Sequence, residues 1–491
     1  MKILTYISRI VIGALFIVSG IVKANDTLGF SYKLEEYFEN GALAYRIRDW
    51  FGWDSFSLEF LIPYAIWIAI ILCAAEIVLG FSVLFGTKVK TTLFSLLILT
   101  VVFFFLTLHT ATCDPNASYN NLTTIEKNSP AHTQMLSRMQ ENNKITIVEE
   151  KENTTVFKEE LPVQCVTDCG CFGDAMKGSL GRSLTPWESW SKDFILLIFI
   201  IPIFLYRKKI KINTTKDDII IFASSIVFVS CLSWVFNWYF PLLFFILGYL
   251  GFFASKRLLF NNALKWIPIL WISLISLLFI YYTYNHLPLK DYRAYAIGKN
   301  IPQQMVLPEG AVPDVFENIF YYKNKTTGKV EEFTEKNYPW DNENYEFSDR
   351  KTKLISEGVK PQITDFTMSA DDGNDYSQDY FNEEAYIFLL VAYDINKTNE
   401  RSIKKINTFV DQCNVDGNYV IGLTSSSYND VEDFKLKNQL MLDFFTCDAV
   451  TLKTVIRANP GIVLMKKGTI LGKWNANDLP NYELVKKEYL K

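Results

Sequence analysis

The chain has 491 residues, of which 49% are hydrophobic and 15% aromatic, so it exceeds one usual domain and is not a disordered or low-complexity protein. The net charge of −4, from 49 basic and 53 acidic residues, argues against nucleic acid as a partner. Three histidines are too few for histidine-rich metal chemistry. A mean hydropathy of +0.10 predicts membrane spans joined to a water-soluble part.

Membrane-spanning segments fill the first half of the chain. Seven apolar segments are long enough, or nearly so, to cross about 30 Å of hydrocarbon, and they lie at 4–22, 60–84, 91–109, 194–206, 218–236, 238–254 and 264–284. The fourth can be extended back through Trp187 and Trp190, a residue type common at membrane interfaces. The first carries Arg9 and ends at Lys23 without a small-residue cleavage site, which predicts a retained span.

The short loops between spans carry positive charge, which sets the expected orientation. The basic residues of these loops are Lys88, Lys90, Arg207, Lys208, Lys209, Lys211, Lys256 and Arg257. With the N-terminus inside, all three loops fall in the cytoplasm, and the longer stretches 24–59, 110–190 and 285–491 are exported. Six of the eight cysteines then face a compartment where disulfides form. They are Cys113, Cys165, Cys169, Cys171, Cys413 and Cys447.

The region 286–491 has the pattern of a soluble α/β domain. A hairpin is expected at 313–333, followed by a polar connector and a strand that turns at Asp372-Gly373. The core elements expected next are a buried strand at 385–394, a helix at 398–413, a strand at 418–426, a helix at 429–446 and two strands within 459–474. The order β-α-β-α-β-β is typical of a thioredoxin core.

A redox-active thioredoxin carries Cys-x-x-Cys directly after its first core strand, where a helix N-terminus lowers the thiol pKa. Here the strand leads into INKTNER, residues 395–401, without a cysteine. The sequence therefore predicts a thioredoxin-like domain that does not exchange dithiols in the usual way. Cys413 and Cys447 each follow a predicted helix, and they are either joined in a disulfide or buried as free thiols.

Two stretches of the first half resemble a known family. RIVIGALFIVSGIVKANDTLGF (9–30) and DCGCFGDAMKGSLGRSLTPWESWSKDFILL (168–197) are similar to the DoxX-like membrane proteins that include the methylamine-utilisation protein MauE. The resemblance implies a four-helix bundle over roughly 1–206. The polar insert 114–163 is longer than the family pattern, and ITIVEEKENTTVFKE (144–158) within it predicts an exposed hairpin. About three further spans follow at 207–285. The resemblance also implies a thiol-redox role, because MauE is associated with maturation of a disulfide-rich periplasmic enzyme.

The second half resembles the thioredoxin-like extension of such proteins in the Bacteroidetes group. The stretches that carry this resemblance are HLPLKDYRAYAIGKNIP (286–302), PQITDF (361–366) and RANPGIVLMKKGTILGKW (457–474). It implies that Pro460 stands where the family places a cis-proline, beside a groove for an extended peptide. We therefore expect Pro460 to contribute to partner binding, unless it is an ordinary turn residue.

Cys169-Gly170-Cys171 is the most specific constellation, with Cys165 four residues upstream and Cys113 at the end of the third span. One interpretation is that Cys169 and Cys171 alternate between dithiol and disulfide, relayed through Cys113 or Cys165, and pass electrons to a quinone. A second is that these cysteines form permanent structural disulfides. A third is that Cys165, Cys169 and Cys171, with Cys113 or His109, bind zinc, although Cys-x-Cys spacing is unusual for zinc. We therefore predict no bound metal.

Glu76 is an ionisable residue inside the second span and should face a partner or a polar cavity. It either contributes to a proton route or a quinone site, or clamps two helices, with Arg9 as a candidate partner. Gly20 and Gly80 are expected to permit close helix approach, and Lys23 to extend to the headgroups.

These patterns predict a bacterial inner-membrane protein with a periplasmic thioredoxin-like domain. The preferred hypothesis is a membrane thiol–disulfide oxidoreductase whose soluble domain binds a periplasmic client protein, with membrane lipid around the spans. The alternative is a non-enzymatic scaffold or maturation factor with purely structural disulfides.

Overall fold

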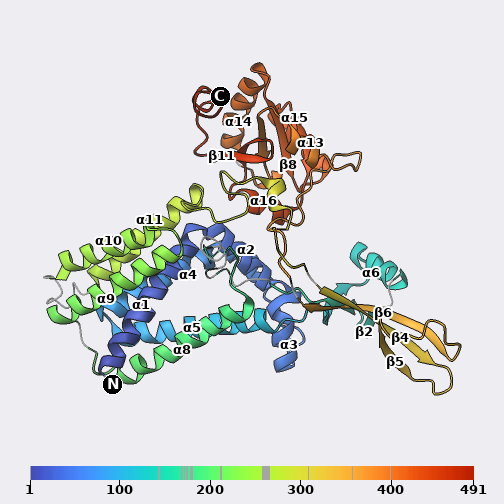
Figure 1. Cartoon of the computed structure of the whole chain (residues 1–491), viewed down its shortest axis with the longest axis horizontal. Helices are drawn as coiled ribbons and strands as arrows, with labels where there is room; N and C mark the ends of the chain where they lie inside the picture. Colours follow the sequence, from blue (N-terminus) through green and yellow to red (C-terminus); the bar gives the residue numbers. More distant parts are fainter. Residues whose placement is uncertain are drawn as a thin grey trace. The chain divides into compact units, whose positions relative to one another are not determined.

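The computed structural model describes residues 2–141, 144–166, 170, 172, 175–176, 181–210, 213–256, 266–307, 309–313, 315–356, 358–398 and 400–490. The chain divides into two compact units, residues 1–293 and 294–491. The first is built mainly from helices and the second mainly from strands and short helices (Figure 1).

The first unit is a bundle of long apolar helices. Its main helices are α1 (Lys2–Asn25), α4 (Ala65–Phe85), α5 (Val89–Thr112), α8 (Pro186–Tyr206), α9 (Thr215–Val235), α10 (Phe240–Ser255) and α11 (Ile267–Asn285). Within the described residues, six helical stretches are long and apolar enough to span a membrane, and α10 is an additional shorter apolar helix. Helix α8 begins at Pro186, which confirms the extension through Trp187 and Trp190. The unit is therefore that of a multi-pass membrane protein.

Close contact between α1 and α4 depends on glycine. A Cβ atom added to Gly20 would lie 2.7 Å from Ile77 Cγ1, and one added to Gly80 would lie 2.8 Å from the Gly13 carbonyl oxygen. Because neither position has room for a side chain, the two helix backbones approach closely. This confirms the packing role predicted for both glycines.

Polar contacts hold the helices together at both ends of the bundle. At one end, Arg9 of α1 donates to Asn213 Oδ1 at 2.7 Å and to the Leu84 carbonyl oxygen at 2.9 Å. At the other end, Thr283 of α11 donates to the Ala24 carbonyl oxygen at 2.6 Å. The start of α1 thus meets the end of α4 and the segment before α9, and the end of α1 meets the end of α11. This is the alternation expected of successive membrane spans.

The remaining elements of this unit lie near the end of the bundle where α1, α5 and α11 end. They are α2 (Thr27–Phe38), η1 (Asn40–Ala44), α3 (Tyr45–Phe51), η2 (Glu59–Tyr64), β1 (Ser118–Glu126), α6 (Pro130–Glu141), β2 (Ile145–Glu150) and β3 (Thr154–Pro162). The strands form an antiparallel sheet in the order β1-β3-β2. The β2–β3 pair confirms the hairpin predicted at 144–158, and β1 and α6 complete a small folded insert.

The second unit begins with α12 (Ile301–Gln304) and a separate antiparallel sheet. This sheet consists of β4 (Val315–Asn324), β5 (Val330–Thr334) and β6 (Tyr345–Ser356), in the order β5-β4-β6. The β4–β5 pair confirms the hairpin predicted at 313–333. The prediction that a polar connector follows this hairpin is wrong, because residues there form the strand β6, which pairs with β4 along its length. Tyr345 and Phe347 of β6 make edge contacts with Phe333 and Tyr322, and these aromatic contacts outweigh the polar composition.

A five-stranded mixed sheet is the core of the second unit. Its elements are α13 (Ser377–Asn382), β7 (Ile387–Val391), η5 (Ile395–Lys397), α14 (Glu400–Val415), β8 (Tyr419–Thr424), α15 (Tyr428–Asn438), β9 (Asp443–Thr446), α16 (Ala449–Val455), β10 (Gly461–Lys466), β11 (Thr469–Asn475) and α17 (Tyr482–Tyr489). The strand order is β11-β10-β7-β8-β9. Strands β7, β8 and β9 are parallel, and β10 and β11 are antiparallel to their neighbours. This is a thioredoxin-like arrangement.

The helix predicted at 429–446 is too long. Helix α15 stops at Asn438 because Gln439 adopts a left-handed conformation (φ +54°). The residues after it form β9, which pairs with β8 and buries Phe445.

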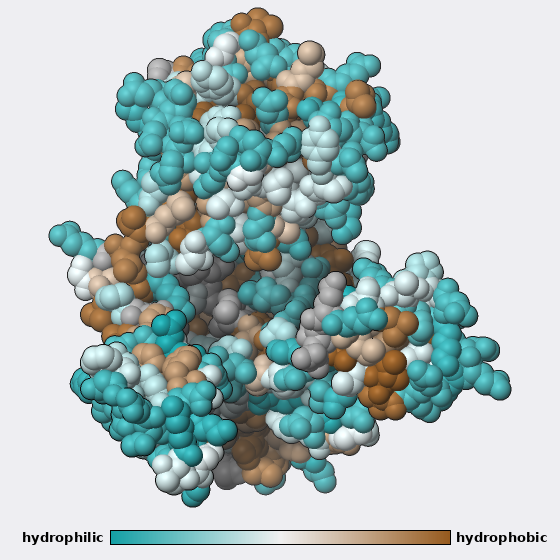
Figure 2. All heavy atoms as spheres, turned by 90° about the vertical axis from the view of Figure 1, so that its right-hand side faces the viewer, coloured by the Kyte–Doolittle hydropathy of each residue, from teal (hydrophilic) through white to brown (hydrophobic). Residues whose placement is uncertain are grey.

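The surfaces of the two units differ in polarity. The face of the second unit visible in Figure 2 is mostly hydrophilic. Many apolar side chains of the bundle helices are exposed, such as Val227 at 69% and Trp234 at 70%.

Candidate functional site

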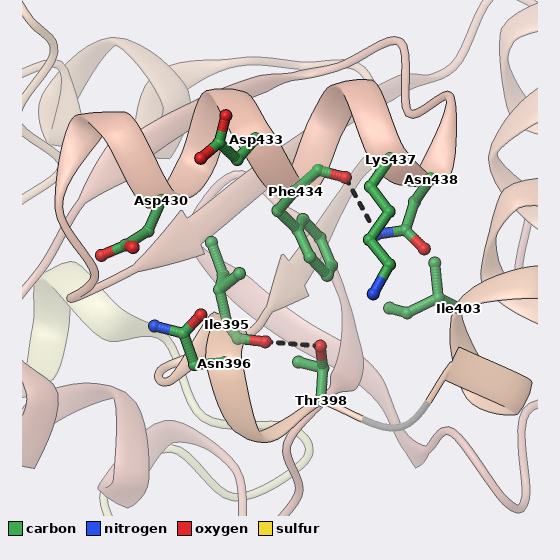
Figure 3. Close-up of a pocket in the computed structure, with 9 residues that line it drawn as sticks. All are labelled: Ile395, Asn396, Thr398, Ile403, Asp430, Asp433, Phe434, Lys437 and Asn438. Atoms are coloured by element: carbon green, nitrogen blue, oxygen red, sulfur yellow. Dashed lines mark hydrogen bonds between the residues drawn. The ribbon is translucent and has the colours of Figure 1, made fainter.

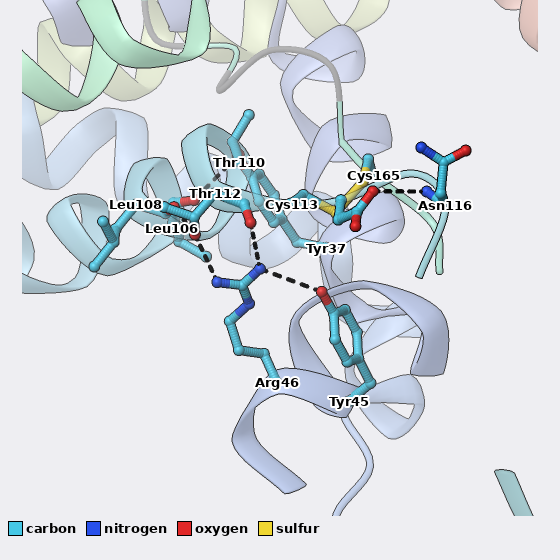
Figure 4. Close-up of a disulfide and its surroundings, with 11 residues drawn as sticks. Tyr37, Tyr45, Arg46, Leu106, Leu108, Thr110, Thr112, Cys113, Asn116 and Cys165 are labelled. Atoms are coloured by element: carbon cyan, nitrogen blue, oxygen red, sulfur yellow. Dashed lines mark hydrogen bonds between the residues drawn. A yellow bond between two sulfur atoms is a disulfide. The ribbon is translucent and has the colours of Figure 1, made fainter. Parts of the chain in front are cut away.

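A disulfide joins Cys113, just after α5, to Cys165, just after β3 (Figure 4). The Cα atoms of the two residues are 5.7 Å apart and their sequence separation is 52 residues. Both cysteines are partly exposed. Arg46 of α3 braces the end of α5 by donating to Thr112 Oγ1 at 2.6 Å and to the Thr112 carbonyl oxygen at 2.8 Å. The disulfide therefore closes the base of the β1–β3 insert at a place that solvent can reach.

Cys169 and Cys171 lie outside the described residues, but their described neighbours pack on the bundle. Gly170 has a left-handed conformation (φ +63°), and a Cβ atom there would be 3.5 Å from Phe30 and Lys33 of α2. Phe172 is 6% exposed and stacks on Phe236 with 5.4 Å between ring centroids. Gly170 and Phe172 are therefore both held against helices of the bundle.

A buried ion pair lies inside the bundle. Lys23 of α1 donates to Glu76 Oε1 of α4, and the two side chains are 1% and 2% exposed. The Lys23 Nζ atom also lies 4.0 Å from the centroid of the Phe103 ring. The expectation that Lys23 extends to the headgroups is wrong, since the carboxylate of Glu76 holds its ammonium inside the protein. Arg9 is not the partner of Glu76, because it bonds Asn213 and the end of α4.

A second buried acid lies beside this pair. Asp193 of α8 is 2% exposed and accepts a hydrogen bond from Thr107 Oγ1 of α5 at 3.1 Å. Its other carboxylate oxygen is 3.0 Å from Lys192 Nζ. Ser19, Lys23, Glu76, Phe172, Lys192 and Asp193 are among the residues that line one cavity of about 20 Å³. The sequence prediction identified Glu76 but missed Asp193, although an acid at the start of an apolar helix is a recognisable signal.

This cavity does not fit a quinone. Pockets that bind small molecules usually have volumes of about 300–1,000 Å³, more than tenfold the volume beside Glu76. The cavity walls therefore leave no room for a quinone ring.

The described residues contain no group of three or more histidine, cysteine, aspartate or glutamate side chains that could hold a metal ion. Because Cys113 and Cys165 are joined, their sulfur atoms are not thiolate ligands in this state.

In the second unit, the place of a thioredoxin redox motif is taken by a short turn without sulfur. Strand β7 is followed by η5, and a pocket of about 300 Å³ lies between this turn and α15 (Figure 3). Its walls include Asn396, Asp430, Asp433 and Lys437. Thr398 Oγ1 donates to the Ile395 carbonyl oxygen at 2.7 Å and fixes the turn. These side chains can form hydrogen bonds and ion pairs, but the turn offers no thiol.

The Asn459–Pro460 peptide bond is cis. Asn459 Nδ2 donates to the Asp394 carbonyl oxygen at 2.7 Å, which ties the turn before β10 to the turn after β7. Pro460 itself is buried, whereas Asp394 and Asn459 are partly exposed.

Cys413 and Cys447 are buried free thiols, not a disulfide. Burial raises the pKa of each thiol to about 12, helped by Asp416 near Cys413. Both sulfur atoms are therefore protonated and unreactive at neutral pH.

A family model described as a domain of unknown function, DUF8463, matches residues 316–357, which cover most of the β4–β6 sheet. Among solved structures, the chain is similar to the solution structure of a thiol:disulfide interchange protein from Bacteroides sp.. The two are 16% identical with a TM-score of 0.21, and the match covers 26% of this chain and 86% of that chain. The comparison with curated proteins found no match.

Proposed function

We propose that this protein supports thiol–disulfide exchange at the periplasmic face of a bacterial inner membrane and belongs with the DoxX/MauE-like proteins. The observation that carries the proposal is the partly exposed Cys113–Cys165 disulfide, from which the Cys-Gly-Cys segment is only four residues away. Four residues span at most about 14 Å, so the length of the chain permits the two cysteine pairs to meet. The positively charged loops at the other end of the bundle favour the cytoplasm for that end.

In the proposed reaction, a thiolate of Cys169 or Cys171 attacks a disulfide of a periplasmic client protein. One S–S bond forms as another breaks, and the leaving thiolate takes up the proton that the attacking thiol lost. The second thiol of the pair then attacks this mixed disulfide, so that the client leaves as a dithiol and Cys169 and Cys171 are joined in a disulfide. The Cys113–Cys165 disulfide exchanges with the reduced pair by the same two steps, and the reverse of these steps passes a disulfide to a client. The step transfers a disulfide between thiol pairs and consumes no external electron acceptor.

The thioredoxin-like domain is proposed to hold the client without chemistry of its own. Its turn at 395–398 has no cysteine, and its own thiols are buried and protonated. Exposed Asn396 and Lys397, with the partly exposed Asn459 beside Pro460, are the groups that we propose to contact an extended peptide.

Thiol trapping in intact cells tests this function. Cells are quenched with acid, alkylated before and after mild reduction, and the modified cysteines are read by mass spectrometry. We expect Cys169 and Cys171 to be found in both states, while Cys413 and Cys447 serve as internal references that stay reduced. Cysteines at 169 and 171 that never change state during client folding would contradict the proposal.

A scaffold is the second candidate, because the disulfide fastens both ends of the β1–β3 insert to the bundle. A permanent structural bond of this kind is the usual fate of exported cysteines. The double variant Cys169→Ser, Cys171→Ser separates the two functions. Exchange predicts that disulfide exchange with the client is lost while client binding is retained, whereas a scaffold keeps both.

A further inference from the structure

Four charged side chains from three helices line the small cavity in the bundle. Lys23 comes from α1, Glu76 from α4, and Lys192 and Asp193 from α8. Glu76 lies eleven residues after Ala65, about 16 Å along α4 from its first residue, so the cavity is well inside the span. Ionisable groups at such depth are costly and usually serve a function.

One atom of this cluster has no partner. Glu76 Oε1 accepts from Lys23, but Glu76 Oε2 is buried and forms no hydrogen bond with any residue that the structure describes. A buried carboxylate oxygen without a hydrogen bond is unfavourable, because it has lost its water partners without replacement. Because Glu76 also lines the cavity, the missing partner is expected there.

The size and charge of the cavity define that partner. Its volume of about 20 Å³ accommodates one water molecule. The two lysines and two acids already balance in charge, so the cavity does not attract an additional ion. Ser19 and Asp193 also face the cavity and provide further hydrogen-bonding groups for a water molecule.

Phe172 links the cavity to the Cys-Gly-Cys segment along the chain. This residue lines the cavity, lies 5.0 Å from Lys192 Nζ measured to its ring centroid, and directly follows Cys171 in the sequence. Other titratable groups that face Glu76 are Lys23, Lys192 and Asp193 around the cavity, and Cys73 on α4 itself.

We infer that the cavity binds one water molecule that joins Glu76 to Asp193. We infer also that these two carboxylates, linked by the water, hold a proton during thiol–disulfide exchange. The use of the proton rests on the proposed function. The S–H bond of the attacking thiol breaks, and its proton passes to the carboxylate of Glu76 or Asp193. When the client disulfide breaks, the leaving thiolate takes this proton back, so no proton is gained or lost.

The water itself can be tested without any assay of exchange. A structure of the full chain in lipid nanodiscs, at a resolution that shows ordered water, should contain a density peak within hydrogen-bond distance of Glu76 Oε2. In Glu76→Met the peak should be lost, since a thioether is a weak acceptor. An empty cavity in the unsubstituted protein would overturn the inference whatever the protein does.

The proton role is tested by rates of exchange with a disulfide-containing model peptide. Glu76→Gln and Asp193→Asn keep the side-chain shape but cannot hold the proton, so we expect each to slow exchange by about a hundredfold. The matched control is Asp218→Asn, which removes another buried acid that pairs with a lysine, Lys256, at the opposite end of the bundle. Unchanged rates in Glu76→Gln and Asp193→Asn, or an equal loss in Asp218→Asn, would overturn the proton role.

A further variant covers the case in which single substitutions prevent folding. Replacing both partners, as Lys23→Met with Glu76→Met, removes two buried charges together and is expected to fold. It should retain the Cys113–Cys165 disulfide and exchange as slowly as Glu76→Gln; exchange at the unsubstituted rate would contradict the proton role. Absence of exchange in the unsubstituted protein would refute the proposed function, whereas fast exchange in the variants refutes only this inference.

Discussion

Sulfur atoms lie in opposite environments in the two units. In the first, Cys113 and Cys165 form a partly exposed disulfide at the end of a membrane bundle. In the second, Cys413 and Cys447 are free thiols that are buried 98% or more inside a thioredoxin-like domain. The unit whose fold is usually associated with thiol chemistry therefore has inert thiols. The surroundings of a cysteine, and not the fold that contains it, therefore set its reactivity.

The largest expected effect is on alkylation of the two buried thiols. With a pKa of about 12, only roughly one molecule in ten thousand carries a thiolate at pH 8. We expect Cys413 and Cys447 to react about a thousandfold more slowly in the folded protein than after unfolding. Their rates should rise about tenfold for each pH unit up to the pKa. The alkylation rates are measured by mass spectrometry. Rates in the folded protein equal to those in the unfolded chain would show that the thiols of the second unit are not protected by burial.

Removing the disulfide should have the next largest effect. Closing a loop of 52 residues restricts the unfolded chain by about 4 kcal/mol, so Cys113→Ser with Cys165→Ser should loosen the β1–β3 insert. Limited proteolysis in detergent should show faster cleavage within 114–163. Cys231→Ser changes an exposed free cysteine of α9 and is the control. Equal resistance of both variants would mean that the insert is held by other contacts.

A smaller effect is expected when a polar atom replaces sulfur in the second unit. Cys413 is 0% exposed and packs in the core with Ile406 and Phe409. Cys413→Ser buries a hydroxyl group there and should lower the free energy of unfolding by roughly 1–3 kcal/mol. Cys413→Ala tests the loss of volume alone. If the serine variant is as stable as the alanine variant in denaturant titrations, the hydroxyl has found a partner in the helix.

The smallest effect should follow Asp416→Asn. Burial is the larger cause of the raised pKa of Cys413, and the carboxylate of Asp416 is the smaller one. Loss of the charge should lower the thiol pKa slightly and speed alkylation only a few-fold. A rate close to that of the unfolded chain would show that charge, and not burial, protects this thiol.

Much of the architecture could be predicted because its signals are local. Long apolar segments predicted the membrane helices. The buried strand at 385–394 and the Asn459-Pro460 turn indicated the thioredoxin-like core. Strand β6 was missed because its polar residues are compatible with a strand only once Phe347 contacts Tyr322. Strand β9 was missed because the helical pattern before it continues past Gln439, where the helix stops.

The site depended on contacts that sequence does not encode locally. The pairing of Cys113 with Cys165 could not be chosen over other pairings, because the distance between cysteines is set by the fold. Lys23 could reach either the headgroups or the interior, and only the position of Glu76 on α4 decides between them. Asp193 could have been found from its place in an apolar helix, but its link to Thr107 requires α5 and α8 to lie side by side.

Within the second unit, the β4–β6 sheet leaves and re-enters the thioredoxin-like core at neighbouring points. Val359 N donates to the Val312 carbonyl oxygen at 2.9 Å, and Ile363 N to the Gln304 carbonyl oxygen at 3.0 Å. A segment whose ends meet can be shortened, lengthened or grafted onto another protein with little disturbance of the host. The thioredoxin-like core can thus gain, lose or exchange this arm during evolution while its central sheet remains the same.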